Sequence, residues 1–434
     1  MPDYDHEIEL ETGRVKINAA LRKTISFVLA GGRGSRLMDL TDNKAKPAVP
    51  FAGKYRIIDF PLSNCVNSGI RKIVVPTQYK SHLLIQHVYR SWGFMRAELG
   101  EFVSALPAQQ QIDENTWYRG TADAVWQNVE IITKSDIDYV LILAGDHVYK
   151  QDYSRMLHQH IARGADVSVS CLEVAQEEAT RFGVVGVNEE DEIIAFQEKP
   201  KDPATIPGKP GRSFASMGIY IFNADFLVKE LEIEALSEGT KHDFGGDILP
   251  RLLGKSKMYA HRFSHSSVGT EEGAEPYWRD VGTIDSYWEA NMDLCDVTPE
   301  LNLYDEDWPI WTYQAQRPSA KFVFNDMGRT GTATDSIVSG GVIVSGSSIS
   351  HSLLSSNVRV HSYSTIAESV LLPHVVINRG CRLRKCVVDS RVVLPRDMII
   401  GENKSEDAKY FYVSDNGVTL VTQPMVDKWV ADHS

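Results

Sequence analysis

The sequence predicts two domains of different architecture, an α/β domain over residues 24–299 and a parallel β-helix over residues 322–434. Two observations predict this division. In the first region short apolar runs alternate with amphipathic stretches, which is the order of strands and helices in a parallel sheet. In the second region aliphatic residues recur at a spacing of six, which is the repeat of a hexapeptide β-helix.

Three apolar runs are the predicted strands of the first domain. Residues 25–30, 73–76 and 139–144 are short, rich in aliphatic and β-branched residues, and end at turn signals. Residues 81–92 and 121–133 have the apolar spacing of helices. Strands that alternate with helices build a mostly parallel, Rossmann-like sheet with helices on both faces. Such sheets bind ligands at the carboxyl ends of their strands, so the segments after the first and third runs are the first places to search.

The six-residue spacing defines the predicted interior of the β-helix. An ordinary run of short strands is the alternative, but the spacing persists through several coils, and this favours the β-helix. The expected inward side chains are Ile337, Ile343, Ile349, Leu354, Val360, Ile366 and Leu372, then after a phase slip Leu371, Ile377 and Leu383, and finally Val387, Val393 and Ile399. Residues 300–321 are expected to form a linker, and residues 1–23 an N-terminal extension.

Composition and charge exclude several classes of function. The net charge of −13 disfavours general binding to nucleic acid or to a membrane surface, because both need an excess of Lys and Arg. The five cysteines are scattered without a C-x-x-C pair, so neither a disulfide framework nor a zinc site is predicted. Residues 1–23 lack the apolar core of a signal peptide, and no stretch of about 18 apolar residues occurs. We therefore expect a cytoplasmic protein with no nucleic-acid or membrane partner.

A glycine-rich turn directly follows the first predicted strand. Glycines let backbone N–H groups approach phosphate oxygens, and nearby cations strengthen such a site. The turn lacks the Gly-Lys-Ser/Thr ending of a P-loop, and its arginines differ from the small residues of a dinucleotide fold. A turn without a ligand is the alternative, but two arginines and two lysines within fourteen residues favour a polyphosphate site. The residues are Gly31, Gly32, Arg33, Gly34, Arg36, Lys44 and Lys46.

Two aspartates are candidate metal ligands. Asp146 follows the third predicted strand, where a carboxylate at the rim of the sheet can hold Mg²⁺. A helix N-cap is an equally good interpretation of Asp146. Asp280 lies in an aromatic and glycine-containing segment, residues 275–283. The two carboxylates form one site only if the fold brings them together, which the sequence does not show.

Seven motifs occur in the order found in bacterial ADP-glucose pyrophosphorylases of glycogen synthesis, which the chain resembles over nearly its whole length. They are the glycine-rich turn, Ala45–Val49, Trp117–Ala124, Ala144–His147, Glu198–Pro200, Ala215–Tyr220 and Tyr277–Thr283. The resemblance implies a nucleotidyltransferase domain followed by a left-handed β-helix for regulation and oligomerisation. It implies transfer of the adenylyl group of ATP to glucose 1-phosphate with Mg²⁺ as cofactor. Allosteric sugar-phosphate or nucleotide effectors and a homotetramer are implied as well.

The resemblance also implies roles for individual residues. The catalytic residues would be Arg36, Lys46, Asp146 and Asp280, with the two aspartates holding Mg²⁺. The phosphates of ATP would contact Gly31, Gly32, Arg33, Gly34, Arg36 and Lys46. Glucose 1-phosphate would contact Tyr118, Gly183, Glu198, Lys199 and Ser216. Gln78 and Trp117 would carry regulatory communication, and the effector positions would be Lys44, Arg56 and Lys134.

Three alternatives remain open at the level of sequence. A pyrophosphorylase that uses UTP or dTTP would share the turn and the β-helix. A regulatory subunit without turnover would share the fold, although the chain keeps the catalytic set. A hexapeptide-repeat acyltransferase would need a catalytic histidine in the β-helix, where His351, His361 and His374 are available.

Overall fold

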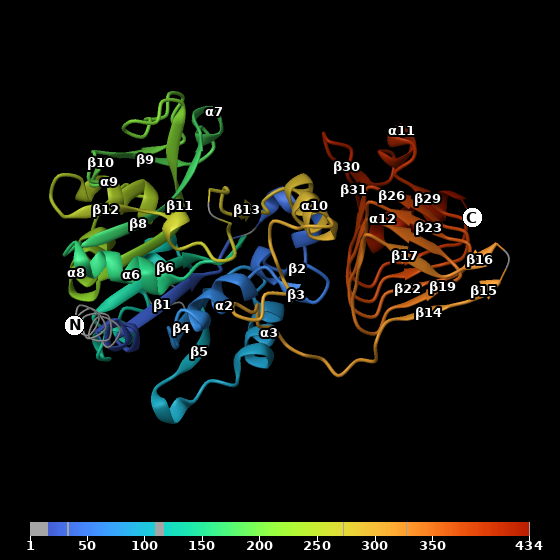
Figure 1. The fold of residues 1–434 in the computed structure, drawn as a ribbon, viewed down its shortest axis with the longest axis horizontal. Coiled ribbons are helices and arrows are strands. Elements are labelled where there is room, and N and C mark those ends of the chain that lie inside the picture. The colour runs from blue at the N-terminus through green and yellow to red at the C-terminus, as the bar shows by residue number, and fades with distance from the viewer. Residues whose placement is uncertain (1–15, 33, 109–116, 272, 327, 434) are drawn as a thin grey trace, which may run out of the picture.

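The computed structural model describes residues 16–32, 34–108, 117–271, 273–326 and 328–433. It contains an α/β domain and a β-helix that lie side by side (Figure 1). Arg33, one of the predicted phosphate ligands, lies outside the described residues. None of the described helices combines the length and the apolar character that crossing a bilayer needs.

A central sheet organises the α/β domain. Its strands follow the order β10-β9-β11-β6-β1-β4-β5, with β8 paired to β11 and β12 paired to β8. Strands β1, β4, β5 and β6 are parallel neighbours, whereas β11 is antiparallel to β6 and β10 is antiparallel to β9. The predicted mostly parallel sheet is therefore confirmed. The strands are β1 (Thr24–Leu29), β4 (Lys72–Thr77), β5 (Phe102–Pro107), β6 (Tyr139–Ala144), β8 (Val167–Ala175), β9 (Gly183–Val187), β10 (Ile193–Glu198), β11 (Arg212–Asn223) and β12 (Met258–Arg262).

Helices cover both faces of this sheet. Alternate side chains of β1 enter two different cores: Ile25 and Phe27 pack with helices α4, α5, α8 and α9, and Val28 packs with α2, α3 and α6. The helices are α2 (Asp59–Asn67), α3 (His82–Trp92), α4 (Thr121–Trp126), α5 (Glu130–Thr133), α6 (Tyr153–Ala162), α7 (Gln176–Ala179), α8 (Ala224–Ala235) and α9 (Leu249–Leu252).

The helix predicted over residues 121–133 is wrong as a single element, because it is divided into α4 and α5. Asn128 lies at the break. Its side-chain amide donates to the backbone oxygen of Ala124 at 2.8 Å, while its backbone N–H donates to Val125. In a regular α-helix the backbone N–H of Asn128 would donate to the backbone oxygen of Ala124. Here the side chain of Asn128 occupies that oxygen, so the series of backbone hydrogen bonds is interrupted.

The C-terminal domain is a left-handed parallel β-helix. Its strands stack in three parallel columns, drawn at the right of Figure 1. The first column is β14 (Lys321–Val323), β19 (Ile343–Ser345), β22 (Arg359–Val360), β25 (Val376–Ile377) and β28 (Val393–Leu394). The second is β17 (Thr332–Thr334), β20 (Ser348–Ser350), β23 (Thr365–Ala367), β26 (Arg382–Arg384) and β29 (Ile399–Ile400). The third is β18 (Ile337–Val338), β21 (Leu353–Leu354), β24 (Val370–Leu371), β27 (Cys386–Val388) and β31 (Thr419–Val421), with β30 (Tyr412–Val413) antiparallel at its end.

The predicted phase of the β-helix is wrong at several positions. Val393 and Ile399 are 46% and 47% exposed, and the neighbouring Leu394 and Ile400 fill the interior. Similarly, Val344 is buried beside the half-buried Ile343. Ile337 pairs with Leu353, sixteen residues on, and Leu354 pairs with Leu371, seventeen residues on, so a strict spacing of six slips by one or two residues in each coil.

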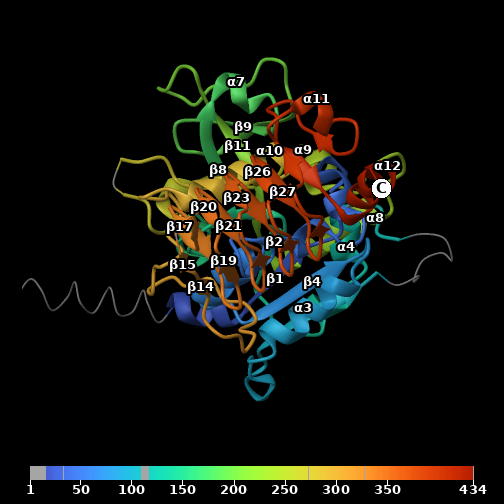
Figure 2. The ribbon, with the colours of Figure 1, turned by 90° about the vertical axis from the view of Figure 1, so that its right-hand side faces the viewer.

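An apolar layer joins the two domains. Leu372 and Val387, which were predicted to point inward, pack instead with Ile284 and Tyr287 of helix α10 (Ile284–Met292). Figure 2 views the molecule from the β-helix side, with α10 behind the coils. The indole of Trp288 donates to the backbone oxygen of Glu368 at 2.7 Å. Helix α10 is therefore held by the β-helix, and it directly follows the segment that carries Asp280.

His160 makes the stability of the α/β domain sensitive to acid. Its ring contacts Ser168 Oγ at 2.9 Å and Asn223 Oδ1 at 3.2 Å in the core, and burial lowers its pKa to about 4. The folded protein therefore resists a proton that the unfolded chain accepts below about pH 6.5. The stabilisation is complete above that pH and decreases by about 3 kcal/mol as the pH falls to about 4.

We expect His160→Gln to weaken the loss of stability between pH 7 and pH 5. Urea unfolding at both pH values measures the effect, and His158→Gln on the exposed face of α6 is the control. An unchanged pH dependence in His160→Gln would contradict the assignment.

Candidate active site

Two adjoining cavities open beside the carboxyl ends of the parallel strands. The first, of about 570 Å³, is lined by Leu29, Pro76 and Ala144 from the ends of β1, β4 and β6. The second, of about 880 Å³, lies between strands β9, β10 and β11 and residues 275–289. Arg36 lines both cavities. Ligands in the two cavities would therefore meet near this side chain.

The glycine-rich turn forms one wall of the first cavity. Gly31, Gly32 and Gly34 line it. Gly34 has φ +65°, and a Cβ there would lie 2.8 Å from Cβ of Lys46. Both the backbone conformation and the close approach of Lys46 therefore exclude a side chain at this position. The turn continues into a short 3₁₀ helix, Ser35–Thr41.

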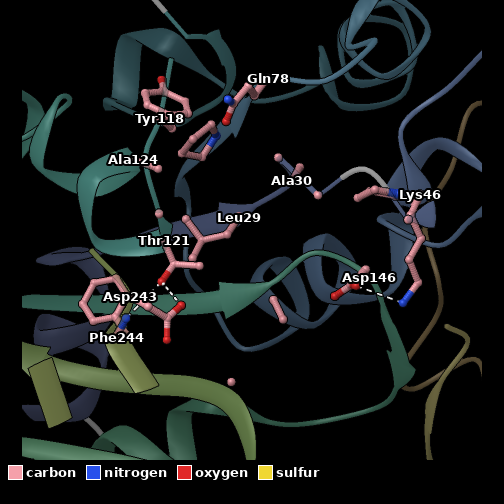
Figure 3. Close-up of a pocket in the computed structure, with 18 of the residues that line it drawn as sticks. Leu29, Ala30, Lys46, Gln78, Tyr118, Thr121, Ala124, Asp146, Asp243 and Phe244 are labelled. Carbon is pink, nitrogen blue, oxygen red and sulfur yellow. Dashed lines mark hydrogen bonds and ion pairs between the residues drawn. The ribbon is translucent and has the colours of Figure 1, made fainter. Parts of the chain in front are cut away.

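Lys46, Asp146 and Asp280 meet where the two cavities adjoin: Lys46 and Asp146 line the first cavity, and Asp280 lines the second. Nζ of Lys46 lies 2.9 Å from Oδ2 of Asp146 and 2.8 Å from Oδ1 of Asp280. Asp146 lies between β6 and the short strand β7 (His147–Tyr149), and Asp280 ends β13 (Trp278–Asp280). Strands β7 and β13 pair with Asp280 opposite His147, and this pairing brings together aspartates that are far apart in the sequence. Figure 3 shows Lys46 reaching Asp146.

The electrostatics of this cluster favour the charged forms of Lys46 and Asp146. Burial opposes the charge of Lys46, but Asp146 and Asp280 more than offset it and raise the pKa of Lys46. Burial also opposes the charge of Asp146, yet His147 and Lys46 lower the pKa of Asp146 to about 2. Because burial lowers the pKa of His147, its ring is neutral near pH 7 and Lys46 is the effective cation. Asp146 thus faces the first cavity as a carboxylate, paired with the cationic Lys46.

The two aspartates fit a divalent cation. Oxygen atoms of Asp146 and Asp280 and a ring nitrogen of His147 lie within 4.8 Å of one another. Carboxylate oxygens are the ligands that Mg²⁺ prefers, and Mg²⁺ takes one or two carboxylates together with substrate phosphates. Nε2 of His147 lies 3.5 Å from Oδ1 of Asp146, and Nδ1 of the same ring is buried without a hydrogen-bond partner among the described residues. The donor set suits Mg²⁺, which would share the carboxylates with Lys46.

The far side of the first cavity is formed by aromatic and polar side chains. Gln78, Tyr118 and Phe244 line it, opposite Lys46 (Figure 3). Thr121 donates to Oδ2 of Asp243 at 2.8 Å and accepts from the backbone N–H of Phe244. The resemblance placed Tyr118 in the sugar pocket, whereas its side chain lines the first cavity and not the second.

Asp243, which the sequence analysis did not single out, lines both cavities. Its Oδ1 accepts from the backbone N–H of Gly246 and caps the π-helix Phe244–Ile248. The signal in the sequence was an Asp-Phe-Gly-Gly segment, which marks a turn but not a site.

The second cavity contains the other residues that the resemblance assigned to the sugar phosphate. They are Gly183, Glu198, Lys199 and Ser216. Gly183 lies opposite Glu198 in the β9–β10 pair, and a Cβ on Gly183 would lie 3.2 Å from Oε2 of Glu198. Nζ of Lys199 pairs with Oε1 of Glu198 at 2.9 Å. Both side chains are more than half exposed, so this pair can open to a ligand.

The predicted regulatory residues lie in three different settings. Gln78 lines the first cavity, whereas Trp117 lines neither cavity and is 52% exposed. Lys44 is buried and donates to Oδ1 of Asp389 in the β-helix at 2.9 Å. The guanidinium of Arg56 bonds to the backbone oxygen of Ala48. Lys134 pairs with Glu130 on the exposed surface of α5.

Comparisons with known proteins agree with this geometry. Residues 25–297 match the family described as nucleotidyl transferase, and residues 318–421 match the GlmU-like C-terminal hexapeptide. The first match spans both cavities, so the α/β domain is a nucleotidyl transferase domain.

Similar curated proteins show which nucleotidyl transferase family the chain belongs to. The chain is 59% identical over 409 residues to a glucose-1-phosphate adenylyltransferase of Rhodospirillum rubrum, covering 94% of this chain and 97% of that protein. It is 54% identical over 426 residues to the protein of the same name from Dechloromonas aromatica, covering 98% and 97%. The chain belongs to the glucose-1-phosphate adenylyltransferase family. The resemblance predicted from the seven motifs is thereby confirmed.

Proposed function

We propose that this chain transfers the adenylyl group of ATP to glucose 1-phosphate, giving ADP-glucose and pyrophosphate, the committed step of bacterial glycogen synthesis. One observation carries the proposal: Lys46, Asp146 and Asp280 meet beside Arg36, which lines both cavities. ATP occupies the first cavity, beside the glycine-rich turn. Glucose 1-phosphate occupies the second cavity, beside Lys199 and Glu198.

The reaction then follows from charge and position. A phosphate oxygen of glucose 1-phosphate attacks the α-phosphorus of ATP in line, the new P–O bond forms, and the bond to pyrophosphate breaks. The attacking oxygen is already an anion, so no general base is needed. Lys46 and Arg36 neutralise charge on two anionic reactants and on the leaving pyrophosphate, and the cavities hold the reactants in line.

We propose that Mg²⁺ is the cofactor and that Asp146 and Asp280 hold it. The donor set described above supports this assignment. When bound, the ion supplies positive charge to the phosphates. The aspartates orient the ion, and His147 and Lys46 hold the pKa of Asp146 well below neutral pH.

The choice of nucleotide is tested by pyrophosphate release from glucose 1-phosphate with ATP, UTP and dTTP side by side. We expect ATP to be strongly preferred. A preference for UTP or dTTP would overturn the assignment of ATP as the substrate. No turnover with any nucleotide would indicate a regulatory subunit. The acyltransferase alternative has no support in the cavities, because His351, His361 and His374 line neither of them.

We further propose a cytoplasmic homotetramer that is regulated by sugar-phosphate or nucleotide effectors. The contact between buried Lys44 and Asp389 supports regulation, because it links the segment before Lys46 to the β-helix. Assays with fructose 1,6-bisphosphate, fructose 6-phosphate, pyruvate and AMP test it. Activity that none of these changes would count against regulation, and sedimentation would determine the oligomeric state.

Lys199→Ala tests the sugar-phosphate half of the site. We expect KM for glucose 1-phosphate to rise by about fiftyfold, because a charge-assisted contact to the phosphate is lost. KM for ATP should stay within about twofold, because ATP lies in the other cavity. Lys201→Ala, an exposed neighbour outside both cavities, is the control. A rise in KM for ATP with no change for glucose 1-phosphate would contradict the assignment.

A further inference from the structure

The second cavity has few cations available for a phosphate. More carboxylates than cationic side chains line it among the described residues. On the proposed function, the phosphate group of glucose 1-phosphate enters this cavity as an anion. A cation that is already paired must release its carboxylate before it can bind a phosphate fully, so an unpaired cation has an advantage.

Most of the cations that line this cavity have carboxylate partners. The pairs are Arg36 with Asp280 (3.7 Å), Lys199 with Glu198 (2.9 Å), Arg212 with Glu275 (2.8 Å) and Arg279 with Glu300 (3.1 Å). Among the described residues that line the cavity, Arg181 is the cation without a carboxylate partner.

The backbone places Arg181 next to Lys199. Arg181 precedes Phe182, whose backbone oxygen accepts from the N–H of Lys199 at 3.0 Å. Lys199 itself has φ +47°, a conformation that residues other than glycine rarely adopt, and this turns the chain at the end of β10. The two cations thus extend from adjacent strand ends and line one cavity. Neither of them lines the first cavity.

We propose that Arg181 is a second phosphate-binding residue for glucose 1-phosphate, acting beside Lys199. The proposal rests on the function proposed above. The planar guanidinium presents several N–H donors that match two phosphate oxygens. Lys199 is partly neutralised by Glu198, so Arg181 supplies the charge that the cavity otherwise lacks.

The test is steady-state kinetics of the full-length wild type, Arg181→Ala, Arg181→Lys and Arg212→Ala, with ADP-glucose formation as the readout. In Arg181→Ala we expect KM for glucose 1-phosphate to rise about tenfold. Values of kcat and of KM for ATP should stay within about twofold. Arg181→Lys keeps the charge and should recover most of the affinity. Arg212→Ala removes the same charge from the same cavity, but from a paired residue, and should change KM by less than about twofold.

Three outcomes would overturn the inference and leave the proposed function standing. The first is an unchanged KM for glucose 1-phosphate in Arg181→Ala. The second is an equal rise in KM for both substrates, which indicates a general structural effect. The third is an equal rise in KM for glucose 1-phosphate in Arg212→Ala, which would indicate that the overall electrostatic field of the cavity binds the phosphate and that a specific contact does not. Absence of ADP-glucose formation by the wild type would overturn the proposed function itself, and this inference with it.

Discussion

Asp146→Asn is expected to lower kcat for ADP-glucose formation by about three orders of magnitude. The substitution keeps the size of the side chain but removes the negative charge that Lys46 holds at 2.9 Å. On the proposed function this carboxylate orients the Mg²⁺ that neutralises the phosphates. The loss should therefore appear in kcat at saturating substrates. The assay is pyrophosphate release over a series of Mg²⁺ concentrations.

The control is Asp225→Asn, which removes the same charge from an exposed position in the first turn of α8. We expect this variant to keep kcat within about twofold. If Asp146→Asn retained near-native kcat with a normal Mg²⁺ dependence, the metal assignment would be wrong.

Lys46→Met is expected to lower kcat by at least two to three orders of magnitude. Methionine matches the length of the lysine stem and fits the buried position, where the lysine side chain is 5% exposed. The substitution leaves Asp146 and Asp280 facing each other without the shared cation. It also removes a positive charge from the phosphates of ATP. Both effects act on the transition state, in which negative charge shifts toward pyrophosphate.

Thermal unfolding distinguishes a loss of kcat caused by the missing charge from one caused by misfolding. Lys229→Met, on the exposed surface of α8, is the matched control and should change neither kcat nor the melting temperature. A Lys46→Met protein that is folded and retains more than about a tenth of the wild-type kcat would exclude Lys46 from the catalytic set.

The sequence predicted those parts of the fold that depend on local pattern. Strand β6 begins and ends where the apolar run does, and helix α3 lies within the predicted range. Prediction failed where one side chain alters a regular element, as Asn128 does between α4 and α5. It also failed in the β-helix, because coils of sixteen or seventeen residues do not keep a strict spacing of six, and Val393 lies on the surface.

For the site as well, local pattern predicted some features and long-range contacts determined the others. Strand position singled out Asp146 as a candidate ligand, and an aromatic and glycine-containing context singled out Asp280. Their meeting depends on the antiparallel pairing of β7 with β13, a long-range contact that no local pattern encodes. Asp243 was missed for a related reason, because its place between the two cavities is set by a hydrogen bond from distant Thr121.

The central claim is that the two substrates lie on either side of Lys46, Asp146 and Asp280. A crystal structure of the protein with Mg²⁺ and ADP-glucose tests this claim most directly. The account predicts the adenine in the first cavity beside Tyr118, and the glucose in the second cavity within hydrogen-bond distance of Glu198. The diphosphate should lie between them, next to Lys46 and a Mg²⁺ held by Asp146 and Asp280. Glucose in the first cavity, or ADP-glucose bound away from both cavities, would contradict the account.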